Sequence, residues 1–376
     1  MFKEVTLSKR EPDYLFLWTV IVMAVIGTVF VYSSSFAIAA NYDSGNPQFY
    51  LIHHFIRLVL SFVFFGVFAV VDYRKVVNLG GAAYVASLIM LVVVLFLPGD
   101  NTVNGARRWI DLGFMNFQVS EFAKVALVLT IIRSITRDPE MIRTRNGFVK
   151  ELSKIGTTSF LIMLEPDFST ALIVGIIGLA LLYMAGAKLL HVLACLIVTL
   201  PVAAIVMVIK SYRIQRILSF FNAAGAEKSM SYQLKQSLIG LGNGEIFGRG
   251  LGQGEQKYFF LPEPHTDFVF SIIGEEIGFI GCIAILGLFL FLTYRGIRIA
   301  VDAPEIKGRL LTAGFVFTVF IYVIMHTFVN TGIIPTTGVP LPFLSYGGTN
   351  LLLVMSSMGI ILNVSRMRSS ERGYSG

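Results

Sequence analysis

Long apolar runs without a charged residue recur along this chain, and they constrain its fold more than any other feature. One extends from Tyr14 to Ala40 and another from Val76 to Leu97. A helix of about 20 mostly apolar residues is needed to cross the hydrocarbon core of a bilayer. Both runs are long enough, and the first is too long for the apolar region of a signal peptide.

The composition agrees with this interpretation. Residues of the AVILMFWYC set make up 55% of the chain, charged residues only 14%, and the mean hydropathy is +0.74. Soluble domains need about 25% charged residues, so this chain cannot cover a water-facing surface. The net charge is +7, but the Lys and Arg residues lie in the connections between apolar runs, and no nucleic-acid partner is predicted. We therefore predict an all-α, polytopic membrane protein.

Ten spans are predicted, of which the fifth is short. They are Tyr14–Ala40, Phe49–Val71 (which contains Arg57), Val76–Leu97, Gln118–Ile132, Ile155–Leu164, Ala171–Ala187, Leu189–Ile209, Phe268–Tyr294, Leu310–Asn330 and Phe343–Val364. Most of the 30 Lys and Arg residues fall in the inner connections if the N-terminus is cytoplasmic, as basic loops are on that side. The expectation is one domain, residues 1–376, with both termini cytoplasmic and a large extracytoplasmic loop at about 210–267.

Two charged residues interrupt the fourth span. Glu121 and Lys124 are three residues apart, so they share a helix face and can pair. On chemistry alone a structural ion pair is the better interpretation. The alternative is a pair that lines a polar cavity and tunes a third group.

The outer loop after the third span holds Arg107 and Arg108 beside Trp109. An arginine offers a planar fork of donors that matches phosphate oxygens. Arginine and tryptophan also anchor a protein at the lipid headgroups, and this second interpretation is the simpler one.

The large loop ends in the sequence LPEPHTDF, which places Glu263, His265 and Asp267 at the mouth of the eighth span. A partly dehydrated carboxylate there can act as a general base. Asp267 can equally be a helix cap. Earlier in the loop, Lys257 with Arg213 and Arg216 makes the outer surface basic enough to attract a pyrophosphate.

Glycines 248, 250, 252 and 254 in the same loop lack the Walker ending of a nucleotide loop. They indicate a flexible or closely packed backbone. The segment 336–350, TTGVPLPFLSYGGTN, contains three Gly and two Pro, and it predicts a re-entrant or tightly packed outer loop rather than one straight helix. The sequence identifies no metal ligands.

Several motifs together resemble the SEDS family, the shape, elongation, division and sporulation proteins that include FtsW, RodA and SpoVE. The motifs are NGARRWIDLG (104–113), QVSEFAK (118–124), YQLKQSLIGLGNGEIFGRGLGQGEQK (232–257), LPEPHTDFVFSIIGEEIGFIG (261–281) and GVPLPFLSYGGTN (338–350). The family's QPDLGTA motif corresponds to EPDFSTA here, so Glu165 replaces Gln and Asp167 is retained.

The resemblance implies a peptidoglycan glycosyltransferase that polymerises lipid II by inverting transfer during cell-wall elongation or division. It implies that Asp267 is the catalytic base, and that Glu121, Lys124 and Asp167 shape or tune the cavity. Arg108, Lys257 and Arg213 or Arg216 would face the pyrophosphate, with a divalent cation (Mg²⁺ or Mn²⁺) as a further candidate. The implied partners are lipid II, a class B penicillin-binding protein and other elongasome or divisome membrane proteins. The implied location is the bacterial cytoplasmic membrane, with the active site facing outside.

Two alternatives stay open. A lipid II flippase would need a polar path across the bilayer, whereas the polar candidates cluster in the outer half. If the protein were a non-catalytic scaffold for the penicillin-binding protein, the outer carboxylates and arginines would have no function.

Overall fold

The computed structural model describes residues 7–9, 11–42, 45–97, 102–103, 106–113, 115–197 and 232–369. Its helices are α1 (Tyr14–Tyr42), α2 (Phe49–Val70), α3 (Tyr73–Phe96), α4 (Val119–Arg137), α5 (Arg145–Leu164), α6 (Phe168–Met184), α9 (Tyr232–Asn243), α10 (Val269–Asp302), α11 (Ile306–Asn330) and α12 (Gly348–Ser365), with a 3₁₀ turn at Met141–Arg143. Residues 189–197 are also helical.

The described strands form three two-stranded antiparallel ribbons. They are β1 (Leu7–Lys9) with β6 (Met367–Ser369), β2 (Thr102–Val103) with β3 (Ala106–Arg107), and β4 (Trp109–Asp111) with β5 (Asn116–Gln118). Six helices, α1, α2, α3, α10, α11 and α12, are long and apolar enough to cross a membrane. The prediction of an all-α polytopic membrane protein is confirmed. Residues 198–209 of the seventh predicted span lie outside the described residues.

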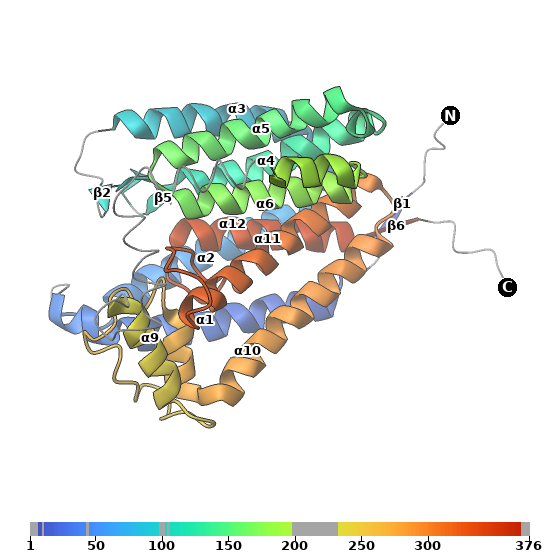
Figure 1. Ribbon diagram of the computed structural model, residues 1–376. Helices are drawn as coiled ribbons and strands as arrows, with labels where there is room; N and C mark the ends of the chain where they lie inside the picture. Colours follow the sequence, from blue (N-terminus) through green and yellow to red (C-terminus); the bar gives the residue numbers. More distant parts are fainter. Residues whose placement is uncertain are drawn as a thin grey trace.

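The helices form a bundle with α11 and α12 near its centre (Figure 1). The helices α3, α4, α5 and α6 lie on one side of this pair, and α1, α9 and α10 on the other. The most extensive packing is between α12 and α2 and between α3 and α4. Most residues of α12 are buried, whereas less than a third of those of α2 and α3 are, as expected for helices at the lipid boundary.

The fifth span differs from the prediction, because α5 has 20 residues and begins at Arg145 rather than Ile155. Its additional turns carry an ion pair within the helix, between Glu151 and Lys154. The ammonium of Lys154 lies 2.8 Å from both carboxylate oxygens of Glu151 and 2.6 Å from the hydroxyl of Ser134 on α4. An ion pair three residues apart lets a charged helix remain buried, which a search for uncharged runs cannot detect.

The helix α10 is broken at Gly278, where φ is 68° and ψ is −169°. Only glycine adopts this conformation without strain. The break releases backbone groups, and the segment 245–250 of the preceding loop satisfies them. The amides of Arg249 and Gly250 donate to the carbonyls of Glu275 and Glu276, and the amides of Phe279 and Ile280 donate to those of residues 245 and 246. Gly248 and Gly254 of the glycine-rich run are thus closely packed, whereas Gly250 and Gly252 are exposed.

The segment between α11 and α12 is not helical and is largely buried, as predicted for the Gly- and Pro-containing sequence. Val339, Leu341, Phe343 and Leu344 are each at most 2% exposed. A β-carbon added at Gly27 of α1 would lie 2.0 Å from the carbonyl oxygen of Phe343. The absence of a side chain at Gly27 therefore lets this segment, hereafter the 331–347 segment, pack directly on α1.

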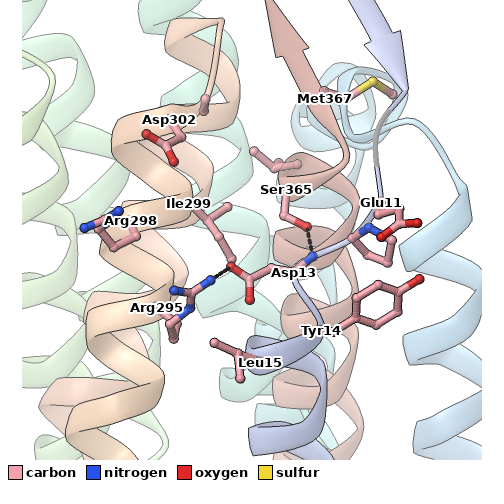
Figure 2. Close-up of a pocket in the computed structure, with 13 residues that line it drawn as sticks. Glu11, Asp13, Tyr14, Leu15, Arg295, Arg298, Ile299, Asp302, Ser365 and Met367 are labelled. Atoms are coloured by element: carbon pink, nitrogen blue, oxygen red, sulfur yellow. Dashed lines mark hydrogen bonds and ion pairs between the residues drawn. The ribbon is translucent and has the colours of Figure 1, made fainter.

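Both ends of the described chain lie at one end of the bundle, opposite α9 and the β2–β5 ribbons (Figure 1). A cavity of about 360 Å³ lies there. Asp13 forms an ion pair with Arg295 of α10 and, through its amide, a hydrogen bond with Ser365 of α12 (Figure 2). No predicted site residue lines this cavity.

Replacing Gly27 by Ala is expected to destabilise the protein by about 1–3 kcal/mol, because the new methyl group must displace backbone. Gly66→Ala on α2 is the matched control, since its β-carbon would meet no atom within 4 Å. It is expected to be neutral or stabilising by up to about 1 kcal/mol. Thermal melting of the purified variants in detergent measures both, and equal melting temperatures would contradict the close approach.

Candidate functional site

Asp267 lies just before α10, at the end of the bundle far from the chain termini. The N-cap residue of α10 is Phe268, one position later, so Asp267 does not occupy the capping position considered from sequence. Its amide donates to the carbonyl of Glu263, and its carbonyl accepts a hydrogen bond from the side chain of Asn330 at 3.1 Å. The side chain is half-buried and faces the 331–347 segment, since a β-carbon at Gly338 would lie 3.5 Å from its Oδ2.

His265 and Glu263 belong to the same turn but differ in exposure. His265 is 5% exposed, and its ring packs against Tyr50 and Tyr346 with centroids 4.7 and 5.5 Å away. The carboxylate of Glu263 is largely exposed, lies 3.9 Å from the imidazole of His265 and accepts a hydrogen bond from Thr266. His265 thus fixes the turn that carries Asp267.

The predicted pair on α4 is confirmed as an ion pair, with the ammonium of Lys124 2.8 Å from the carboxylate of Glu121. Both residues are at most 3% exposed. Two further donors complete the site: the hydroxyl of Tyr322 at 2.9 Å and the side-chain amide of Asn350 at 2.9 Å. The Tyr322 ring also lies under the ammonium, 3.8 Å from it. A cavity of about 20 Å³ adjoins the pair, enough for one water molecule.

Arg108 holds the bend between α5 and α6. Its guanidinium donates to the carbonyls of Glu165 and Pro166 at 3.1 and 2.6 Å, and it lies 3.5 Å from the carboxylate of Asp167. Asp167 in turn caps α6 by accepting from the amide of Thr170. The guanidinium of Arg108 therefore has partners within the protein, and its side chain remains partly exposed.

Glu165 lies in the same turn, outside the helical spans, and is fully buried with neither carboxylate oxygen hydrogen-bonded. Burial and, secondarily, the charge of Asp167 raise the pKa of Glu165 to about 9, against the opposing effect of Arg108. The side chain is therefore a neutral acid at pH 7. In this form it resembles the Gln that the family motif has at this position.

The chain from 338 to 350 joins these groups. The amide of Tyr346 donates to the carbonyl of His265, and the hydroxyl of Ser345 donates to that of Thr266. Asn350, further along, reaches Glu121. Lys124 also lies within electrostatic range of Asp167. Asp267, the Glu121–Lys124 pair and Asp167 therefore belong to one connected region.

Lys257 does not belong to this connected region, and the prediction that its side chain is exposed to water is wrong. The ammonium is 2% exposed and lies 2.7 Å from the carboxylate of Glu276. Ser33 of α1 hydrogen-bonds both groups. The reason is the break in α10, which draws the loop inward over Glu276. Lys257 is thus a structural cation that fastens the loop to two helices.

Two other predictions concern cations. Arg213 and Arg216 lie outside the described residues. Within the described ranges, no group of three or more His, Cys, Asp or Glu side chains could hold a metal ion.

Comparison with known proteins identifies the class. The model of a family described as cell cycle protein, FtsW/RodA/SpoVE, matches residues 13–370. Stage V sporulation protein E of Bacillus subtilis is 37% identical over 96% of this chain and 99% of its own length. A probable peptidoglycan glycosyltransferase FtsW of Trichlorobacter lovleyi is 38% identical over 94% of this chain and 93% of its own.

Solved structures agree. A chain from a peptidoglycan synthase complex superposes with a TM-score of 0.77 at 26% identity, covering 94% of this chain and 98% of that one. The rod shape determining protein RodA of Thermus thermophilus gives 0.70 at 25% identity, with 94% and 97% covered. The chain belongs to the FtsW/RodA/SpoVE family, as its motifs predicted.

Lys257→Met should destabilise the protein by about 3–5 kcal/mol, because it leaves the Glu276 carboxylate buried without its cation. Adding Glu276→Leu should recover most of the loss. Lys235→Met on α9 removes an exposed lysine and should change little. Melting of these three variants and the wild type tests the pair, and a Lys257→Met protein of normal stability would contradict the burial of Lys257.

Glu165→Gln should stabilise the protein increasingly as pH rises from about 5 to 9. The folded state keeps the Glu165 proton up to about pH 9, whereas the unfolded chain loses it near the ordinary value, so wild-type stability falls across this interval. The limit is about 1.4 kcal/mol per pH unit. The difference in melting temperature between variant and wild type should therefore vanish near pH 5. A difference independent of pH, or one equal to that of the exposed control Glu140→Gln, would show that Glu165 is ionised.

Proposed function

We propose that this protein is a peptidoglycan glycosyltransferase that polymerises lipid II by a single inverting displacement, with Asp267 as the general base. The observation that carries the proposal is the position of this carboxylate. It lies half-buried at the mouth of α10 and faces the 331–347 segment, which leads into the first turn of α12, where Asn350 hydrogen-bonds Glu121. The names of the FtsW relatives as probable peptidoglycan glycosyltransferases support the reaction class.

The reaction needs one base and one site of charge stabilisation. The 4-hydroxyl of the acceptor sugar attacks the anomeric carbon of the donor, forming the new C–O bond as the bond to the pyrophosphate breaks. The hydroxyl proton passes to Asp267, and the pyrophosphate leaves with the bonding electrons. Inversion of the α-linked donor gives a β-linked product.

The buried residues shape this site rather than react. Glu121 accepts three hydrogen bonds, from Lys124, Tyr322 and Asn350, so its charge is compensated and its geometry is fixed. Asp167 and Arg108 hold the α5–α6 bend beside it, and the exposed part of Arg108 can meet the pyrophosphate. Lys257 has no role at the donor, and no step is assigned to a divalent cation.

The proposed location is the bacterial cytoplasmic membrane, with both termini cytoplasmic and Asp267 outside. The excess of Lys and Arg in the inner connections supports this orientation. The pairing of β1 with β6, which brings the two ends of the described chain together, supports a common side for both termini. The proposed partner is a class B penicillin-binding protein within the elongasome or divisome. The similarity to a chain of a peptidoglycan synthase complex, described as coordinating polymerization and crosslinking, supports it.

Asp267→Asn should reduce polymerisation of labelled lipid II by about 100-fold or more, since a general base contributes about 10²–10⁴-fold. The amide has the same size, so expression, melting temperature and partner binding should be retained. Purified variants with and without the partner transpeptidase provide the measurement. Asn330→Asp is a useful comparison, because it retains the oxygen that accepts from Ser271 but loses the donor to the Asp267 carbonyl. Polymerisation by Asp267→Asn at the wild-type rate would remove Asp267 from the mechanism.

A further inference from the structure

Arg57 is the charged residue that interrupts the second span, and no carboxylate among the described residues pairs with it. Its guanidinium lies over the ring of Tyr346, 4.8 Å from the centroid. The Nε atom is buried and has no hydrogen-bond partner. A cation placed within a membrane helix without a counter-ion is costly and marks a functional site.

The arginine packs against the first residue of α12. A β-carbon at Gly348 would lie 2.8 Å from the Cδ atom of Arg57, so only glycine leaves room for this contact. The N-cap residue of α12 is Gly347, which has no side chain to satisfy the amides of the first turn. The beginning of this 18-residue helix therefore carries free donors and the positive end of the helix dipole, which together favour an anion.

The side chains of that first turn point to other partners. Thr349 accepts from the amide of Gln118 and donates to the carbonyl of Asn116, and Asn350 donates to Glu121. Neither side chain folds back to cap the helix in these contacts, so the amides beside Arg57 are left for a ligand.

His54 supplies a second, independent polar group. It precedes Arg57 by three residues, so both are on one face of α2. The residue is 1% exposed, and its Nε2 atom has no hydrogen-bond partner. Its ring lies beside the same Tyr346, with the centroids 6.3 Å apart. A buried imidazole nitrogen without a hydrogen-bond partner is unfavourable unless a ligand forms the missing hydrogen bond.

This cluster is directly connected to the turn that carries Asp267. The amide of Tyr346 donates to the carbonyl of His265 at 2.8 Å, and the rings of Tyr346 and His265 are in edge contact. Cationic and donor groups thus lie close to the proposed base but on α2 and α12 rather than on the large loop.

We propose that Arg57, His54 and the N-terminal amides of α12 bind the pyrophosphate of a polyprenyl-linked substrate. The inference rests on the proposed function, and it assigns to this cluster the role that Lys257 cannot fill. The guanidinium supplies charge and a fork of donors to the phosphate oxygens, and the imidazole Nε2 supplies one hydrogen bond. Because Arg57 and His54 lie on the membrane-spanning helix α2, a polyprenyl chain attached to the pyrophosphate can remain in the bilayer.

The test is binding of undecaprenyl pyrophosphate to the purified full chain in phosphatidylcholine nanodiscs. Arg57→Gln should weaken binding about tenfold or more, since hydrogen bonds to charged groups contribute about 1.5–3 kcal/mol. Arg57→Lys should lose less, because the charge is retained without the fork, and His54→Leu should lose less than Arg57→Gln. Arg298→Gln removes an arginine at the opposite end of the bundle, beside the cavity of Figure 2, and should bind as the wild type does.

A second arm identifies the source of the phosphate. Nanodiscs that contain phosphatidylglycerol present a phosphate head group without pyrophosphate, and Arg57→Gln should retain affinity for them. Equal loss for both lipids would make the cluster a general head-group site and overturn the proposal. Unchanged pyrophosphate binding by an Arg57→Gln or an Arg57→Lys protein with wild-type melting would also overturn it.

Because the assay needs no turnover, it separates this inference from the proposed function. Loss of pyrophosphate binding in Arg57→Gln supports the site even if the wild type fails to polymerise lipid II. Conversely, wild-type polymerisation and binding by Arg57→Gln would reject the site and leave the catalytic assignment of Asp267 intact.

Discussion

Buried carboxylates are the constraint around which this membrane bundle is organised. An ionised carboxylate removed from water is unstable unless several donors surround it. Glu165, which has no donor, is kept protonated instead, whereas Glu121, Glu275 and Glu276 obtain their donors from different parts of the chain. Glu121 draws on α4, α11 and α12. Glu276 draws on α1 and the loop before α10. Glu275 accepts from the amides of residues 255 and 256. The requirement for donors therefore fixes helices that apolar packing alone would leave free to slide.

The same requirement explains why some of the site could be predicted from the sequence and some could not. The Glu121–Lys124 pair is local, because three residues on a helix bring the groups to one face, and the sequence predicted it. The position of Asp267 followed from the boundary between a loop and a span. Lys257 and Glu276 are 19 residues apart in sequence, and they meet only because α10 breaks at Gly278 and the loop fills the break. No periodicity in the sequence predicts such a break, so Lys257 was wrongly predicted to be exposed.

Arg57 shows the opposite case, in which the signal was visible but could not be interpreted. A single charge within an apolar span was evident from the sequence. Its meaning depends on Tyr346 and Gly348, which are almost 300 residues away and come close only when the 331–347 segment folds back between the helices. The apolar spans could thus be read from composition, whereas the contacts of the non-helical segment depend on the complete tertiary fold. The fifth helix was predicted too short for a related reason. A search for uncharged runs stops at Glu151 and Lys154, although these two residues form an ion pair within the structure.

The antiparallel pairing of β1 with β6 has a topological consequence. Leu7 stands opposite Ser369 and Lys9 opposite Met367, so the two ends of the described chain are separated by about one strand spacing, 4.8 Å. The described part of the polypeptide thus begins and ends at neighbouring points, beside the ion pair of Asp13 and Arg295. A short linker from Ser369 to Leu7 would join these two points without moving α1 or α12, and the chain could then be opened at an exposed connection elsewhere. The order in which the helices are synthesised and inserted is therefore separable from the arrangement that they finally adopt.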